Sequence, residues 1–247
     1  MFRPLYAALA IALALPAHAD QASIAVAANF SAPMKALQPL FEKATGHVMV
    51  LSSGATGKFY AQIKNGAPFD VLLAADAETP KRLQREGAAL RTQTYAIGKL
   101  ALWSADPRTL DGSDAVLKAN QFKHVAIANP RLAPYGTAAM QVLAKLGLNE
   151  AVRDKQVMGE NIGQTHQYVA SGNAEIGFVA LSQIMLDGKL TSGSVWLIPS
   201  RYYTPIRQDA ALLKHGAGNP AAQALLDFLR TPAAQKLIRG YGYGYDR

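Results

Sequence analysis

The chain is organised around Ser52-Ser53-Gly54-Ala55-Thr56-Gly57-Lys58. This stretch follows an apolar, β-type run at 47–51 and precedes a short helical pattern at 59–63. Small residues at the start of a helix leave backbone N–H groups uncovered, and the positive end of the helix dipole lies at the same place. The stretch therefore predicts a position where an anion can be held.

The same kind of junction occurs three more times along the chain. Small and polar residues follow a strand-like run and open a helical pattern at 27–31, 133–137 and 160–164. One such junction alone is ordinary turn chemistry. Because the carboxyl ends of the strands in an open α/β sheet face one crevice, four junctions together predict a shared ligand site. Its donors would be neutral: backbone N–H groups, the Asn29 amide, the Thr56 hydroxyl, and the hydroxyl or N–H of Tyr135.

Strand-like and helical patterns alternate through both halves of the chain. Apolar β-type runs at 23–27, 47–51 and 69–74 are separated by helical patterns, and the same plan returns between 124 and 180. This β-α-β order is the signature of parallel sheets flanked by helices. We expect an α/β protein with two lobes, each a mostly parallel sheet, and a ligand cleft between them. Crossings near 95–100 and 202–210 place lobe 1 at 20–96 and 203–247, and lobe 2 at 97–202.

The N-terminus has the features of a secretory signal peptide. Arg3 precedes an apolar run at 5–15, and Ala17-His18-Ala19 is a small-x-small cleavage site. The apolar run is too short to span a bilayer. We therefore expect cleavage after Ala19 and a mature protein that begins at Asp20. The chain has no cysteine, so it has neither disulfides nor a lipidation site, and this favours a freely diffusing periplasmic protein.

Charge and motifs argue against nucleic-acid binding and against catalysis. The net charge is +8, but the basic residues are scattered rather than clustered. Residues 52–58 do not fit a phosphate-binding P-loop, since Phe59 stands where Ser or Thr would bind magnesium. We find neither G-x-S-x-G nor H-E-x-x-H, and no acidic pair has metal spacing with histidine. His166 and Lys58 are interpreted as first-turn residues in solvent, so we expect no catalytic residue, cofactor or free metal cation.

A site built only from donors also selects its anion. It suits an anion without a proton, such as sulfate, molybdate or tungstate, whereas hydrogen phosphate carries a donor that needs an acceptor. Glu160 lies beside the fourth junction and is a candidate for that acceptor. The residues alone therefore leave the choice of anion open.

The order and spacing of several segments resemble the periplasmic molybdate-binding proteins, the substrate-binding components of molybdate ABC transporters. The resemblance covers essentially the whole mature chain. It is carried by Ala27-Ala28-Asn29-Phe30, Ser52-Ser53-Gly54-Ala55-Thr56-Gly57, Asn65-Gly66-Ala67-Pro68-Phe69-Asp70-Val71, Ala75-Asp76, Tyr95-Ala96-Ile97-Gly98-Lys99-Leu100, Asn129-Pro130, Ala133-Pro134-Tyr135-Gly136 and Ile176-Gly177-Phe178-Val179-Ala180.

The resemblance implies a type II periplasmic binding protein-like fold that closes on one tetrahedral oxyanion. It implies a monomer that binds molybdate or tungstate and delivers it to an inner-membrane ABC permease. The implied ligand-binding residues are Asn29, Thr56, Tyr135 and Ile162, the last two through backbone N–H groups, with Ala28 and Ala55 beside them. Some relatives have a tyrosine donor at the position of Ala180, so this bond is lost here or replaced by the Tyr135 hydroxyl.

Other functions remain as alternatives. A binding protein for sulfate or another oxyanion would share the fold. An exported enzyme would need a nucleophile–base pair, and the sequence suggests none. A ligand-sensing domain of a regulator is disfavoured by the signal peptide and by the lack of a helix-turn-helix segment before residue 23.

Overall fold

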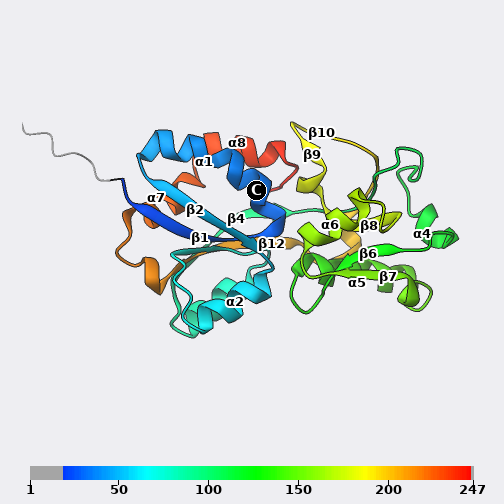
Figure 1. Cartoon of the computed structure of the whole chain (residues 1–247), viewed down its shortest axis with the longest axis horizontal. Helices are drawn as coiled ribbons and strands as arrows, with labels where there is room; N and C mark the ends of the chain where they lie inside the picture. The colour runs from blue at the N-terminus through cyan, green and yellow to red at the C-terminus, as the bar shows by residue number, and fades with distance from the viewer. Residues whose placement is uncertain (1–18, 246–247) are drawn as a thin grey trace, which may run out of the picture.

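The computed structural model describes residues 19–245, which form two lobes side by side (Figure 1). Each lobe is built on a five-stranded sheet. The predicted signal peptide, apart from Ala19, lies outside the described residues. Within the described range, no helix is both long and apolar enough to cross a membrane.

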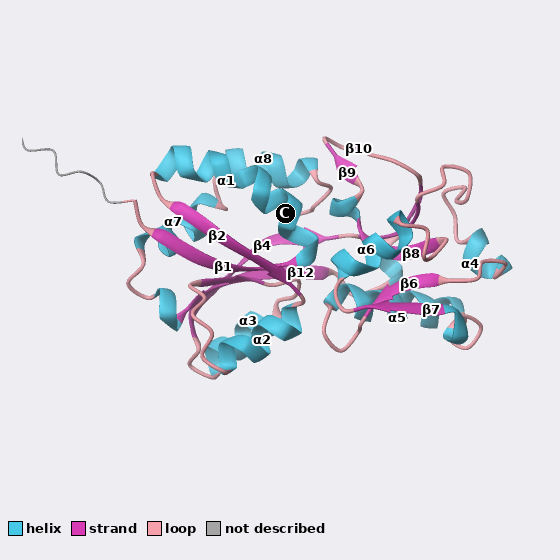
Figure 2. Cartoon of the chain, viewed as in Figure 1, coloured by secondary structure: helices cyan, strands magenta, loops and turns pink. Residues whose placement is uncertain are grey.

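The first sheet has parallel strands at one side and an antiparallel return strand near the other. Its order is β2 (Val48–Gly54), β1 (Gln21–Ala27), β3 (Val71–Leu73), β12 (Ile206–Leu213) and β4 (Ala89–Gly98). Alternate residues of β1 face opposite layers: Ile24 packs with α1 (Ser31–Thr45), α7 (Pro220–Phe228) and α8 (Pro232–Gly240). Ala25 packs with α2 (Thr56–Lys64) and α3 (Glu78–Arg85) instead. Helices therefore cover both faces of the sheet (Figure 2).

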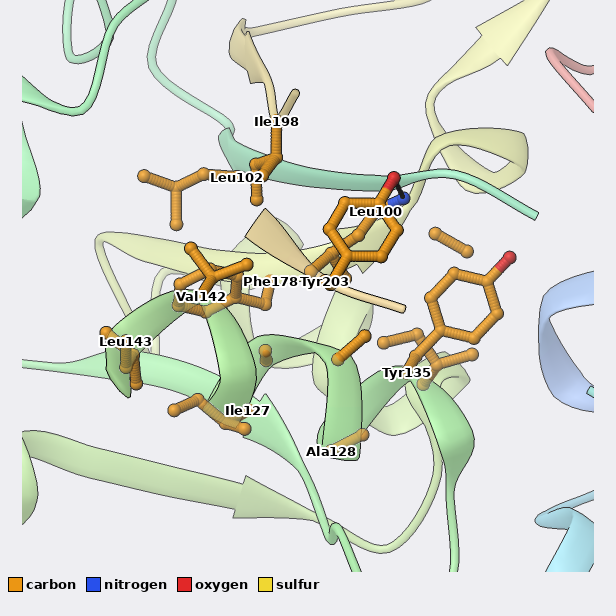
Figure 3. Packing of buried hydrophobic residues seen from close by; sticks show 14 of the residues in the cluster. Leu100, Leu102, Ile127, Ala128, Tyr135, Val142, Leu143, Phe178, Ile198 and Tyr203 are labelled. Atoms are coloured by element: carbon orange, nitrogen blue, oxygen red, sulfur yellow. Dashed lines mark hydrogen bonds between the residues drawn. The ribbon is translucent and has the colours of Figure 1, made fainter. Parts of the chain in front are cut away.

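The second sheet repeats this plan. Its order is β11 (Ser194–Leu197), β5 (Leu100–Ser104), β8 (Ile176–Ala180), β6 (Val125–Ala128) and β7 (Gln156–Gly159). α5 (Pro134–Leu146) covers one face and α6 (Ile162–Ala170) the other. Figure 3 shows the core under α5, where Val142 packs near Phe178 and the Tyr203 hydroxyl accepts a 3.1 Å hydrogen bond from the Leu100 N–H. The short α4 (Ala115–Ala119) and the hairpin of β9 (Met185–Leu186) and β10 (Lys189–Leu190) lie outside this sheet.

One strand in each sheet runs against the other four, and both reversed strands adjoin a passage between the lobes. β12 is antiparallel to β3 and β4, and β5 is antiparallel to β8 and β11. The chain leaves the first sheet after β4, enters β5 beyond Lys99, and returns between β11 and β12. The α/β fold with two mostly parallel sheets, expected from the sequence, is confirmed. We propose lobe boundaries at these passages, close to 96/97 and 202/203.

Two residues of α1 differ from what their local sequence pattern indicates. Ser31 is not an N-cap, because the 3-10 turn η1 (Ala28–Phe30) runs directly into α1 and Ser31 is already helical. Leu40 is 42% exposed, although the helical spacing placed it on the buried face. Leu37 and Phe41 fill that face instead, and Leu40 lies on its solvent side.

The C-terminal Gly-Tyr segment, residues 240–245, pairs with the edge of the first sheet. Gly244 forms an antiparallel bridge with Ile97 of β4. Tyr243 is only 4% exposed and lies in the core of the first lobe. The tail therefore brings a buried tyrosine close to the passage between the lobes.

Candidate functional site

The four junctions line one small pocket between the lobes. Ala28 and Asn29 follow β1, Ala55 and Thr56 follow β2, Tyr135 follows β6, and Ile162 follows β7. The other lining residues are Ala27, Gly54, Ala75, Ala133, Pro134 and Asn161. The structure thus brings together all six residues that the sequence analysis selected.

The cavity wall in the second lobe includes two helix starts. Asn161 caps α6, since its Oδ1 accepts hydrogen bonds from the N–H groups of Gly163 at 2.9 Å and Gln164 at 3.0 Å. This cap leaves the N–H of Ile162, the first residue of α6, for another acceptor. The sequence analysis did not select Asn161, although an Asn directly before a helical pattern is a standard N-cap signal.

The start of α5 lies close to the end of β6 because residue 136 is glycine. A Cβ at Gly136 would lie 2.1 Å from the Ala128 carbonyl oxygen. Pro134 occupies the first turn, where its missing N–H removes no helical hydrogen bond. Tyr135 follows it at the cavity wall, 1% exposed. Its N–H belongs to the first turn, which has no intrahelical acceptor.

Thr56 has its hydroxyl oriented by a neighbouring loop. Its Oγ1 accepts a 3.0 Å hydrogen bond from the Ala75 N–H, and the residue is 2% exposed. The hydroxyl hydrogen therefore remains available as a donor. Next to it, the Gly57 N–H donates to the Leu132 carbonyl of the second lobe at 2.9 Å. Thr56 thus lies where the two lobes make direct backbone contact.

Asn29 is held differently from the sequence expectation. Its Nδ2 donates to Gln208 Oε1 and to the Tyr243 hydroxyl, both at 2.9 Å. Its carbonyl accepts from Ser182 Oγ at 2.8 Å and from the Tyr243 hydroxyl at 2.9 Å. Its Oδ1 is buried and has no partner among the described residues. In this arrangement both amide hydrogens are engaged, so the expected free Asn29 amide donor is not observed.

Tyr135 joins the same set of contacts from the second lobe. Gln208 Nε2 donates to its hydroxyl at 3.1 Å, and Gln208 Oε1 accepts from the Tyr95 hydroxyl at 2.9 Å. Burial raises the pKa of Tyr95, Tyr135 and Tyr243, so these phenols stay neutral. Sequence reasoning missed Gln208, Tyr243 and Ser182, because no local pattern marks residues that meet only in the folded chain.

The described lining of the cavity carries no charged side chain. The nearby Lys58 Nζ and Glu160 Oε2 form an ion pair across the lobes at 2.7 Å, with both side chains about half exposed. Lys58 lies in the first turn of α2 and is half exposed, as the sequence predicts, and it also pairs with Glu160. Glu160, the candidate acceptor for a protonated anion, is paired with Lys58 instead.

Two other residues considered from the sequence lie away from the cavity lining. His166 stacks on Trp103 with ring centroids 4.8 Å apart, and burial lowers the pKa of its imidazole. Ala180 ends β8 fully buried and is not among the lining residues. In the part of the chain that the structure describes, no group of three His, Asp or Glu side chains could hold a metal ion.

Known proteins are similar to this chain in sequence and in architecture. Residues 22–244 match the family model described as bacterial extracellular solute-binding protein. The molybdate-binding protein ModA of Azotobacter vinelandii is 58% identical over 234 residues, covering 94% of this chain and 93% of that protein. ModA of Rhodobacter capsulatus is 51% identical, covering 96% and 93%.

A solved structure of a molybdate-binding protein is also similar to this chain. The periplasmic molybdate-binding protein of Azotobacter vinelandii superposes with a TM-score of 0.88 at 42% identity, covering 92% of this chain and 100% of that one. Both the long family match and the high identity over nearly full length exceed what a shared fold alone would give. The chain therefore belongs to the bacterial extracellular solute-binding proteins and, within them, to the molybdate-binding proteins.

Proposed function

We propose that this protein captures molybdate, and also tungstate, in the cavity between its lobes and delivers the anion to an ABC permease in the inner membrane. The observation that carries the proposal is a small, charge-free cavity lined by the starts of four helical segments. The identity of 58% to a molybdate-binding protein supports the choice of anion. We further propose export to the periplasm, cleavage after Ala19 and action as a monomer.

Neutral donors would hold the dianion. We assign the Thr56 hydroxyl, the backbone N–H groups of Tyr135 and Ile162, and Asn29, with Ala28 and Ala55 forming the adjacent wall. In a cavity shielded from water, converging hydrogen bonds and helix dipoles replace the hydration of the anion. Molybdenum enters only as cargo within the oxyanion, and we assign no resident cofactor, free metal ion or catalytic residue.

The lobes would retain the anion by closing over it. The bond from Gly57 to the Leu132 carbonyl and the Lys58–Glu160 pair join the lobes next to the cavity. Release to the permease requires these contacts to open. A ligand that binds only the folded protein stabilises it by about 2.7 kcal/mol at a concentration a hundredfold above Kd.

Sulfate binding is the second candidate, because a donor-only lining also suits sulfate. Glu160 is engaged by Lys58, and this arrangement disfavours hydrogen phosphate, which needs an acceptor. An exported enzyme has less support: the described cavity lining has hydroxyl groups on Thr56 and Tyr135 but no histidine or carboxylate to act as their base.

The test is calorimetric titration of the mature, ligand-stripped protein with molybdate, tungstate, sulfate and phosphate in turn. We expect tight one-to-one binding of molybdate and tungstate, with sulfate and phosphate much weaker. Tight sulfate or phosphate binding would retain the fold and replace the ligand. If none of the four anions binds, the proposed function is wrong.

A further inference from the structure

Gln208 connects a predicted anion-binding residue of each lobe. It lies on β12, is fully buried, and contacts Asn29 of the first lobe and Tyr135 of the second. Tyr95 is its third partner. Its side-chain partners in the described part of the chain are the neutral groups of Asn29, Tyr95 and Tyr135, so the network is neutral and centred on an amide.

In the hydrogen-bond arrangement described above, one polar atom of the network has no partner. Asn29 Oδ1 is buried without a partner, although Asn29 lines the cavity. A buried acceptor without a donor is unfavourable, and a fully deprotonated oxyanion has no donor to supply. This orientation of the amide therefore conflicts with the proposed ligand.

Turning both amides resolves the conflict without moving any other heavy atom. The oxygen and nitrogen of an amide side chain have nearly the same shape, so their assignment follows from the hydrogen-bond network. With both turned, Gln208 Nε2 donates to Asn29 Oδ1, and the Tyr135 hydroxyl donates to Gln208 Oε1. The Tyr243 hydroxyl can then donate its one hydrogen to Asn29 Oδ1, while the Asn29 carbonyl keeps its hydrogen bond from Ser182 Oγ. The unpartnered atom becomes Asn29 Nδ2, which is a donor and therefore fits an oxyanion.

We propose that Gln208 is a positioning residue that holds the Asn29 amide with its Nδ2 free for the bound oxyanion. Through the Tyr135 hydroxyl, this orientation depends on the second lobe lying against the first. Gln208 thus links the orientation of the Asn29 amide in the anion site to the contact between the lobes. The inference rests on the proposed function and deepens it.

The passage between the lobes is shaped to admit this contact. Gly98 is the last residue of β4, directly before the crossing at Lys99. A Cβ at Gly98 would lie 2.2 Å from the Tyr135 hydroxyl and 2.5 Å from Gln208 Nε2. Glycine is required here for the close approach of these two side chains. The hydrogen bond between the lobes therefore lies at the crossing itself.

The first test is molybdate titration of Gln208→Leu beside the wild-type protein. We expect binding about ten- to a hundredfold weaker, by analogy with metal sites, where removing the residue that orients a ligand has an effect of this size. Gln93→Leu is the matched control, because Gln93 lies in the same sheet and donates to the Leu226 carbonyl. It should bind molybdate like the wild type. Should Gln208→Leu fail to fold, Tyr135→Phe removes only the hydroxyl and should weaken binding in the same direction.

A spectroscopic signature separates positioning from a general structural role. In ¹⁵N-labelled protein, the Asn29 side-chain amide protons, assigned by comparison with Asn29→Asp, should shift when molybdate is added. In Gln208→Leu or Tyr135→Phe at saturating molybdate, that shift should be smaller. If the wild type binds no molybdate, the proposed function fails. If the wild type binds but Gln208→Leu binds equally well, or if the Asn29 amide does not shift, the inference alone is overturned.

Discussion

Two of the contacts between the lobes are chemically opposite. One is the buried network, which consists of Asn29, Tyr95, Tyr135, Ser182, Gln208 and Tyr243. The other is the rim pair, Lys58 and Glu160, which lies beside the cavity with both side chains about half exposed. The first is neutral and shielded from water, whereas the second is charged and open to it.

The difference indicates which of the two contacts controls how tightly the anion binds. Exposed ion pairs contribute about 0–1 kcal/mol and are screened by salt, since water solvates both partners when they separate. A buried amide or hydroxyl has no such substitute, so loss of its partner leaves an unsatisfied group. We therefore expect the buried network to determine the affinity for the anion, and the rim pair to adjust only how easily the lobes separate.

Asn29→Leu should give the largest effect, the loss of tight molybdate binding. The substitution removes the amide from the cavity lining and leaves its partners in the buried network unsatisfied. We expect at least a hundredfold loss of affinity, equivalent to about 2.7 kcal/mol, by calorimetry. Circular dichroism should show that the fold is intact. Wild-type affinity in this variant would mean that the site is misplaced.

Thr56→Ala should weaken binding by about tenfold, because a neutral hydrogen bond contributes about 0.5–1.5 kcal/mol net. The same change removes the acceptor of the Ala75 N–H, so the melting temperature should fall slightly. Thr56→Ser is the matched control, since it keeps the hydroxyl. If Thr56→Ser and Thr56→Ala lose the same affinity, the hydroxyl is not a donor to the anion.

High pH should selectively destabilise the buried network. Burial raises the pKa of Tyr95, Tyr135 and Tyr243. Above about pH 10 the unfolded chain releases these protons while the folded protein keeps them, so the free energy of unfolding falls as the pH rises. Below that pH the contribution is fully present. Each tyrosine adds at most about 1.4 kcal/mol per pH unit to the slope, measured by urea unfolding between pH 9 and 11.

Tyr243→Phe provides the control for this pH dependence. The variant removes one of the buried phenols, so the fall in stability above pH 10 should be shallower than in the wild type. An unchanged slope would show that Tyr243 does not hold its proton in the folded protein.

Lys58→Met should give the smallest effect, a change of less than about threefold in molybdate affinity at low salt. The reason is that solvent compensates for the lost rim pair. The difference from the wild type should disappear at about 1 M salt, where the Debye length is about 3 Å. Glu160→Gln should behave alike. If either variant lost molybdate affinity equally at low and high salt, the charged side chain would be in direct contact with the anion.

Local sequence was sufficient for most of the fold. Short apolar strands, glycines after helices and a repeated β-α-β order predicted two α/β lobes, and Gly46 and Gly147 end α1 and α5 in the left-handed conformation. Local sequence was not sufficient where one element runs directly into the next. Ser31 fits the pattern of an N-cap, but the preceding turn continues into α1 and places it inside the helix.

The sequence by itself determined the four strand-to-helix junctions, because small and polar residues at a helix start expose its N–H groups whatever surrounds them. Only the tertiary structure decided what the side chains at those junctions meet. Gln208 and Tyr243 are 179 and 214 residues from Asn29 in the sequence, yet both bond to its amide. Lys58 and Glu160 belong to different lobes and pair only when the lobes meet. Hydrogen bonds and ion pairs act over a few ångströms in space. The spacing of residues in the sequence therefore does not predict which of them form.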